Sequence, residues 1–290
     1  MARKPQAFSI IQSLRDRYYR ALPGKESLVR TITEAEIPEH VYNSNAIENS
    51  TLTLEETEKI LLQVDLDRFV SEREIFEAKN LARVVAYTEN KAKEAEVSLE
   101  LMLLLHKMLI GNISEDIAGR FRRGNEWVRV GTHIGADPKD VEKLLTDMLT
   151  EYHASVSEHI VKRVTRLHLT FENVHPFCDG NGRIGRALNN YCFIREGYVP
   201  INIAFVNRTR YYEAFKEFED SGKTAVMEEI ISRALTASYH KRLAYLEGKR
   251  VITLAQYAKE AKQSHPNLIN KAHRQTIPAF TEKGEWKIGV

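Results

Sequence analysis

One run of twelve residues, from His175 to Arg186, carries the side chains best suited to chemistry on a phosphate. It reads HPFCDGNGRIGR. The imidazole of His175 can be neutral near pH 7 and can then accept a proton from a hydroxyl group. Asp179 offers the oxygen ligand that Mg²⁺ takes together with substrate phosphates. The run therefore predicts a site that holds a metal–polyphosphate and moves a proton beside it.

The second half of the run is suited to holding anions. Gly180 and Gly182 let the backbone approach a phosphate closely, and Asn181 between them carries amide hydrogens. Arg183 and Arg186 lie three positions apart, so on a helix they share a face and can each bind phosphate oxygens as a fork. Any one of these residues fits a solvated loop with a helix cap equally well, but their combination favours the anion site.

Apolar periodicity places a helix on each side of this run. The upstream stripe is Ile160, Val164, Leu167 and Phe171, and the downstream stripe is Ile184, Ala187, Leu188 and Tyr191. Gly197 is the predicted end of the second helix. The loop therefore opens onto a helix N-terminus, where unpaired N–H groups and the helix dipole attract anions.

The run matches the signature HPFx(D/E)GNGRxxR of the Fic (filamentation induced by cAMP) family at every fixed position, so the chain resembles that family. The resemblance implies a mainly α-helical Fic-type bundle that transfers AMP from ATP, with Mg²⁺, to a Ser, Thr or Tyr hydroxyl of a target protein. It implies that His175 is the base and Asp179 the metal ligand. It assigns the nucleotide to Gly180, Asn181, Gly182, Arg183 and Arg186.

A second, shorter match lies upstream. Residues 44–49 read SNAIEN and match the pattern (S/T)xxxE(G/N) of the inhibitory helix in some Fic proteins, through Ser44, Glu48 and Asn49. The resemblance implies that Glu48 pairs with Arg186 and occupies the partner that the γ-phosphate needs. The same glutamate could also position water for AMP removal, which the sequence leaves open. On their own, these residues look like the end of a short helix, and Glu48 like a surface carboxylate.

Helical spacing recurs between residues 54 and 110, with Thr53 and Glu56 as a capping box at its start. The apolar stripes here are interpreted as core faces: Ile75, Ala78, Ala82 and Val85, then Leu101, Leu104, Leu105 and Met108. Asp137 and Pro138 predict the cap and first position of a later helix.

Glycines break the helical pattern over residues 119–132 and surround Trp127, Val128 and Val130, which predicts a short hairpin. Fic proteins carry a β-hairpin flap here that pairs with a target segment by strand addition. The alternative is a hairpin that only connects helices.

A further helix is expected to begin at residues 207–212. Tyr212 aligns with a tyrosine that the family places near adenine, but Glu219 stands where an asparagine is common. This departure leaves the adenine contacts and the choice of base open. A core role for Tyr211 and a solvent-facing role for Glu219 are equally compatible with the sequence.

The C-terminal segment 248–290 is basic and resembles an excisionase-type winged helix-turn-helix module. A helical pattern begins at residues 251–258, a second helix spans 266–274, and strands at 277–280 and 286–288 flank a turn at 282–285. If the module binds DNA, its contacts are Asn267, Asn270, Lys271 and Arg274. The alternative is a module that packs on the core or contacts protein.

Composition describes an ordinary globule: 290 residues, 43% hydrophobic, 28% charged and a net charge of +2. No apolar run is long enough for a bilayer, and two cysteines suggest reduced thiols in a cytosol, although their pairing stays open. We expect a cytoplasmic protein with no membrane partner and a possible homodimer. The expected divisions are 1–95 (N-terminal region with the inhibitory helix), 96–247 (Fic catalytic core) and 248–290 (C-terminal module).

Two rival functions remain from the sequence. The first is an enzyme that uses a different nucleotide or another phosphate-containing donor at the same site. The second is a DNA-binding regulator whose Fic site senses nucleotides with little turnover. The basic C-terminal segment is the evidence for the second rival.

Overall fold

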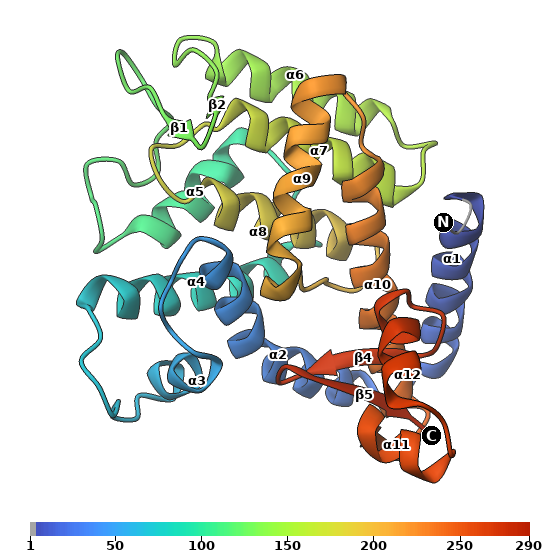
Figure 1. Cartoon of the computed structure of the whole chain (residues 1–290). Helices are drawn as coiled ribbons and strands as arrows, with labels where there is room; N and C mark the ends of the chain where they lie inside the picture. Colours follow the sequence, from blue (N-terminus) through green and yellow to red (C-terminus); the bar gives the residue numbers. More distant parts are fainter. Residues whose placement is uncertain (1–3) are drawn as a thin grey trace.

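The computed structural model describes residues 4–290 and is mainly helical, as predicted (Figure 1). The helices that precede the site loop are α1 (Lys4–Ala21), α2 (Glu26–Ile47), α3 (Leu54–Leu62), α4 (Glu72–Lys91), α5 (Leu99–Ile110), α6 (Val141–Ala154) and α7 (Ile160–Val174). Those that follow it are α8 (Asn181–Arg195), the 3₁₀ turn η1 (Phe205–Asn207), α9 (Arg208–Ser221), α10 (Ala225–Leu246), α11 (Leu254–Glu260) and α12 (His265–His273).

The strands form two small antiparallel sheets. β1 (Arg129–Val130) pairs with β2 (His133–Ile134) in a hairpin that lies later in the chain than predicted, since Trp127 and Val128 precede its first strand and its second strand begins after residue 132. β3 (Val251–Thr253), β4 (Ala279–Glu282) and β5 (Glu285–Gly289) form a second sheet in the order β3-β5-β4. This second sheet and the helices α11 and α12 lie together at the C-terminal end of the chain (Figure 1).

The main core forms where the helices α7 and α8 meet the helices around them. The predicted apolar stripes of both helices are buried, with Phe171, Ile184 and Leu188 fully enclosed. After α8 ends at Arg195, Gly197 takes a left-handed conformation (φ 74°) that closes the helix, as expected. This cluster fixes the two helices whose ends meet at the site loop.

Several predicted boundaries need correction. The helix before residue 48 is long, not short, because α2 runs from Glu26 to Ile47. The region 54–110 is divided into α3, α4 and α5, and Leu104 is 41% exposed and so does not belong to the core face. The capping box at Thr53 and Glu56 is confirmed.

Two further helix starts were wrong. Asp137 begins a turn, in which its Oδ1 accepts the N–H of Lys139 at 3.1 Å, and α6 starts only after Asp140. In the C-terminal segment, residues 251–253 form β3 instead of a helix, because these β-branched side chains pair with β5. Thr253 then caps α11 by accepting the N–H of Gln256.

Packing divides the described residues into two apolar clusters. The larger one contains buried residues from Ile11 to Leu246, and the smaller one contains residues of the C-terminal segment from Ile252 to Ile288. The expected boundary at 95/96 lies within the larger cluster. The division of the chain into separately folding parts stays a prediction.

Candidate active site

The site loop joins the C-terminus of α7 to the N-terminus of α8. His175 takes a left-handed conformation (φ 53°) and ends α7 by donating its backbone N–H to the carbonyl of Phe171. Gly180 is also left-handed (φ 81°), and a Cβ there would lie 2.9 Å from a side-chain carbon of Leu109. These constraints direct the chain into α8 so that its first N–H groups are free of helical partners.

Asn181 holds the loop closed. Its Oδ1 accepts the N–H of Phe177 at 2.8 Å, and its Nδ2 donates to the carbonyl of Phe177 at 2.8 Å. The sequence predicted that the side-chain amide of Asn181 binds phosphate, but this amide is hydrogen-bonded within the loop. The backbone N–H is therefore the group of Asn181 that can donate to an anion.

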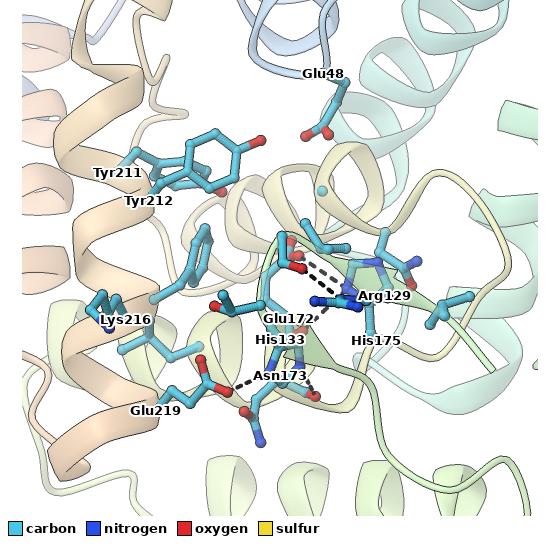
Figure 2. Close-up of a pocket in the computed structure, with 18 of the residues that line it drawn as sticks. Glu48, Arg129, His133, Glu172, Asn173, His175, Tyr211, Tyr212, Lys216 and Glu219 are labelled. Carbon is cyan, nitrogen blue, oxygen red and sulfur yellow. Dashed lines mark hydrogen bonds and ion pairs between the residues drawn. The ribbon is translucent and has the colours of Figure 1, made fainter.

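A cavity of about 880 Å³ lies in front of the loop. Most of the predicted site residues line it: Glu48, Asn49, Trp127, Val128, Val130, His175, Asp179, Gly180, Asn181, Gly182, Arg186 and Tyr212. Ser44 and Arg183 do not. Figure 2 shows Glu48 and Tyr212 facing the same space as His175, although the three come from different parts of the chain.

His175 is positioned as a proton acceptor. Its Nδ1 lies 3.3 Å from the carbonyl oxygen of Glu172, which can only accept a hydrogen bond, so Nδ1 carries the proton and Nε2 keeps a lone pair. Burial lowers the pKa of His175 to about 4, although the nearby backbone bond raises it. The ring is therefore neutral at pH 7.

Arg122 is a buried residue of the site that the sequence did not reveal. Its Nε donates to the carbonyl of His175 at 2.7 Å, and its Nη2 donates to that of Ala136 at 2.7 Å. Its backbone N–H donates to the carbonyl of Pro176 at 2.9 Å. Arg122 therefore ties the site loop to the segments that flank the hairpin, through a contact between residues far apart in sequence.

Asp179 lies in a network of charges at the loop. Its Oδ1 accepts from the backbone N–H of Gly180 at 2.6 Å and from Arg183 at 3.0 Å, and its Oδ2 accepts from Arg73 at 2.7 Å. Arg183 also pairs with Glu77 at 3.3 Å and is almost fully buried. Arg183 is thus paired with the carboxylates of Asp179 and Glu77 in this conformation and does not itself line the cavity.

Asp179 can supply one ligand to a Mg²⁺ ion that is also bound by phosphates. Oδ2 accepts one hydrogen bond and retains a second lone pair, and the carboxyl is one-third exposed toward the cavity. Within the described residues, no group of three His, Cys, Asp or Glu side chains could enclose a metal ion alone. A magnesium ion at Asp179 would therefore depend on phosphate oxygens and water for its other ligands.

Arg186 is held by the end of α2. Its Nη2 donates to Oε1 of Glu48 at 2.8 Å and to the backbone carbonyl of Ser44 at 2.8 Å, and its Nε donates to Oγ of Ser44 at 2.9 Å. The predicted pairing of Glu48 with Arg186 is thus confirmed. Gly182 permits it, because a Cβ at that position would collide with Oε1 of Glu48.

Asn49 and Tyr212 secure the segment that follows α2. Asn49 is left-handed (φ 71°) and its Oδ1 accepts from Arg208 at 2.7 Å. The hydroxyl of Tyr212 donates to the carbonyl of Ile47 at 3.3 Å. These contacts join the end of α2 to α9 across the mouth of the cavity.

The other end of α9 meets the hairpin. Glu219 lines the cavity, and its Oε1 lies 3.1 Å from Nδ1 of His133, whose Nε2 lies 2.9 Å from the carbonyl of Asn173 (Figure 2). Glu219 is thus a cavity residue with a partner. Tyr211 is a core residue: it is 1% exposed, and its hydroxyl lies 2.6 Å from Nε2 of His168.

The hairpin presents apolar side chains to solvent. Trp127, Val130 and Ile134 are 54%, 43% and 59% exposed. Its two strands are two residues long, and Gly131 at the turn has φ 61°. An exposed hairpin beside the cavity has the form required for strand addition, which stays a prediction.

Glu172 is a second cavity residue that the sequence did not reveal. Burial raises the pKa of its carboxyl to about 8, with a smaller increase from Glu48. Its Oε2 lies 4.0 Å from Nδ1 of His175. A protonated carboxyl is therefore the dominant form beside His175 at neutral pH.

The C-terminal module exposes the predicted DNA contacts, Asn267, Asn270 and Lys271 on α12 and Arg274 directly after it. It consists of the helices α11 and α12 and the sheet of β3, β4 and β5, and its likeness to a winged helix-turn-helix stays a prediction. DNA binding by these residues stays a prediction. Elsewhere, Cys178 and Cys192 are free thiols, and none of the helices described over residues 4–290 could cross a bilayer.

Known proteins are similar to this chain in sequence. Residues 96–193 match the model of the Fic/DOC family. A protein adenylyltransferase Fic of Drosophila willistoni is 29% identical over 232 residues, which are 74% of this chain and 46% of that protein. The chain thus spans about half the length of this relative.

Two solved structures share the fold. A Fic domain containing signaling protein from Bacteroides thetaiotaomicron gives a TM-score of 0.74 at 21% identity, over 83% of this chain and 99% of that one. A Fic family protein from Desulfovibrio desulfuricans gives 0.68 at 20% identity, over 98% of this chain and 95% of that one.

Proposed function

We propose that this chain, whose residues 96–193 form a domain of the Fic/DOC family, transfers AMP from ATP to a hydroxyl group of a target protein. The observation that carries the proposal is the neutral His175 at the end of α7, in one cavity with Asp179, Arg186 and the N-terminus of α8. A base, a cation site and an anion site are thereby brought together as phosphate transfer requires.

In the proposed reaction, a Ser, Thr or Tyr hydroxyl oxygen of the target attacks the α-phosphorus. The bond from this phosphorus to the bridging oxygen breaks, and pyrophosphate leaves. The hydroxyl proton passes to Nε2 of His175, which the geometry of Nδ1 leaves free. The N–H groups at the start of α8 are positioned to hold the charged phosphoryl oxygens.

The remaining residues hold the donor. Asp179 would hold Mg²⁺, which when bound neutralises charge on the phosphates. Arg186 would bind the outer phosphates once it is released from Glu48. Arg183 takes the role that the resemblance implies only if a phosphate replaces one of its carboxylate partners, Asp179 or Glu77.

We further propose that Glu48 inhibits the transfer. With Ser44 it takes up the N–H groups of Nε and Nη2 of Arg186, so an outer phosphate cannot bind this edge of the guanidinium as a fork. A phosphate misplaced by about 1 Å can lower the rate by about a hundredfold. Removal of AMP through a water at Glu48 stays an open second activity of the same carboxylate.

The test of the reaction type uses the Glu48→Gly variant with magnesium and either α-labelled or γ-labelled ATP. AMP transfer predicts label on protein from the α-labelled donor alone. Label from the γ-labelled donor would contradict it and favour another phosphate-containing product. Competition by unlabelled GTP, CTP and UTP tests whether a different nucleotide is the better donor, which Glu219 leaves open.

A second proposal concerns the C-terminal module, for which the exposed Lys271 of α12 and Arg274 at its C-terminal end favour duplex DNA as partner. A protein-docking role is the alternative.

The free thiols of Cys178 and Cys192 favour a cytoplasmic location. A homodimer stays a prediction that sedimentation would test.

A further inference from the structure

Helix α2 links the site to the C-terminal module. Its last turn carries Ser44, and Glu48 caps its end, where both contact Arg186. Glu39 lies nine residues before Glu48, about two and a half turns back along the same helix. There the tip of the β4–β5 hairpin meets α2, and Figure 1 shows this hairpin alongside the helix.

The contact is made by the wing turn, which consists of Lys283 and Gly284. Both residues have positive φ angles (52° and 76°), as the tight turn between β4 and β5 requires. Their backbone N–H groups donate to the carboxylate of Glu39, at 3.2 Å from Lys283 and 3.5 Å from Gly284. The side chain of Lys283 also pairs with Glu58 of α3 at 3.0 Å.

Buried charges strengthen the same junction. Lys241 of α10 lies 3.2 Å from Glu36 of α2 and 3.3 Å from Glu282 of β4, so one ammonium group joins the helix to the hairpin. Arg242 pairs with Glu36 at 2.7 Å and is 1% exposed. The module therefore has a fixed position against α2 and α10.

Pro38 gives α2 a weak point between these contacts. A proline inside a helix has no N–H to donate to the carbonyl four residues earlier, here that of Glu34. The helical ladder therefore lacks its bond between Pro38 and Glu34, in the turn that precedes Glu39. The second half of α2, which leads to Glu48, depends correspondingly more on contacts outside the helix.

We infer that Glu39 is a positioning residue: its bonds to the wing turn hold the second half of α2 where Glu48 reaches Arg186. The inference rests on the proposed inhibition by Glu48. A loss of these bonds increases the fraction of molecules in which Glu48 leaves Arg186. It changes no residue that lines the cavity. A partner that lifts the wing turn from α2 would shift the same equilibrium.

The test compares full-length variants by their initial rate of self-labelling with α-labelled ATP. Glu39→Ala should raise the rate several-fold, up to roughly the tenfold that one hydrogen bond to a charged group represents. Glu39→Asp keeps the charge but shortens the reach, and should give a smaller rise. Glu39→Gln keeps one acceptor oxygen but turns an amide N–H₂ toward the second backbone donor, and should give a rise between those of the unmodified chain and Glu39→Ala.

The matched control is Lys283→Ala, which removes an exposed ion pair but leaves both backbone donors in place. It should change the rate less than about twofold, because exposed pairs contribute little. In the Glu48→Gly background, Glu39→Ala should add nothing, since the helix then has no inhibitory carboxylate to position.

Hydrogen exchange gives a readout independent of activity. Glu39→Ala should speed exchange of the backbone amides at residues 44–50 and leave those at 184–194 of α8 unchanged. Unchanged exchange at 44–50 overturns the inference, as does an equal rise in rate with and without Glu48. If Glu48→Gly itself gives no gain, the inhibition proposal fails instead, and exchange still decides whether the wing turn holds α2.

Discussion

At the scale of residues, the cavity separates proton transfer from charge binding. Burial and the carbonyl of Glu172 leave His175 neutral with a free Nε2, while the N-terminus of α8 and Arg186 line the part of the cavity proposed to hold the phosphates. Both functions could be predicted from the sequence, because the residues lie within one short run. Arg122 could not, because its contact with His175 joins positions 53 residues apart.

His175→Ala tests the first of these functions. In the Glu48→Gly background it should lower the rate of AMP transfer by roughly 10²–10⁴-fold, as the loss of a general base does, with ATP affinity nearly unchanged. Single-turnover labelling and ATP titration measure the two quantities separately. A variant that keeps more than about a tenth of the rate would show that another group takes the proton.

The lowered pKa of His175 predicts an unusual pH profile. The active form is the neutral ring, and a pKa of about 4 keeps the ring neutral throughout the range from about pH 7.5 to about 5.5. The maximal rate of Glu48→Gly at saturating magnesium and ATP should therefore stay nearly flat over this range. An ordinary histidine, with pKa near 6.5, would lose about tenfold by pH 5.5.

At the scale of elements, the function depends on where α2 and the hairpin stand relative to α8. The sequence predicted that residues 44–49 lie near Arg186 only through the family resemblance, since nothing local in SNAIEN requires it. The helix boundaries at Asp137 and Val251 were wrong for a physical reason. A turn uses the Asp137 side chain, and pairing with β5 overrides the helical pattern at 251–253.

The exposed hairpin carries a prediction about target choice. Val130→Asp places a charge on the strand that a target segment would join, and should lower labelling of target proteins in a lysate by roughly tenfold, the effect of losing one buried apolar side chain. ATP binding should not change. Val156→Asp, at a valine that is 70% exposed and does not line the cavity, is the control. Equal losses in both variants would exclude a docking role for the hairpin.

At the scale of the whole molecule, the C-terminal module packs against the helices α2 and α10 through specific hydrogen bonds and ion pairs. The sequence predicted its second helix and its wing, because turn residues and apolar alternation are local signals. It could not predict that the wing turn meets Glu39, 244 residues away, since a single carboxylate in a helical sequence gives no sign of its partner. This contact is what makes the module relevant to the site.

If the module binds DNA, duplex affinity of the full chain should fall steeply as salt rises, because lysine and arginine release counterions from phosphates. Arg274→Ala and Lys271→Ala should each reduce the salt slope by about one. An exposed lysine outside the module, Lys93, provides the control substitution. Absence of duplex binding at low salt would leave protein docking as the role of α12.

The pairing of Glu48 with Arg186 is the contact on which the account depends, and one comparison tests it most directly. The rate of protein labelling from α-labelled ATP and magnesium is measured for the unmodified chain, for Glu48→Gly and for Glu48→Gly with Arg186→Ala. The account predicts a marked gain in Glu48→Gly that the second substitution abolishes, because the freed guanidinium binds the outer phosphates. Equal rates for the unmodified chain and Glu48→Gly would contradict it.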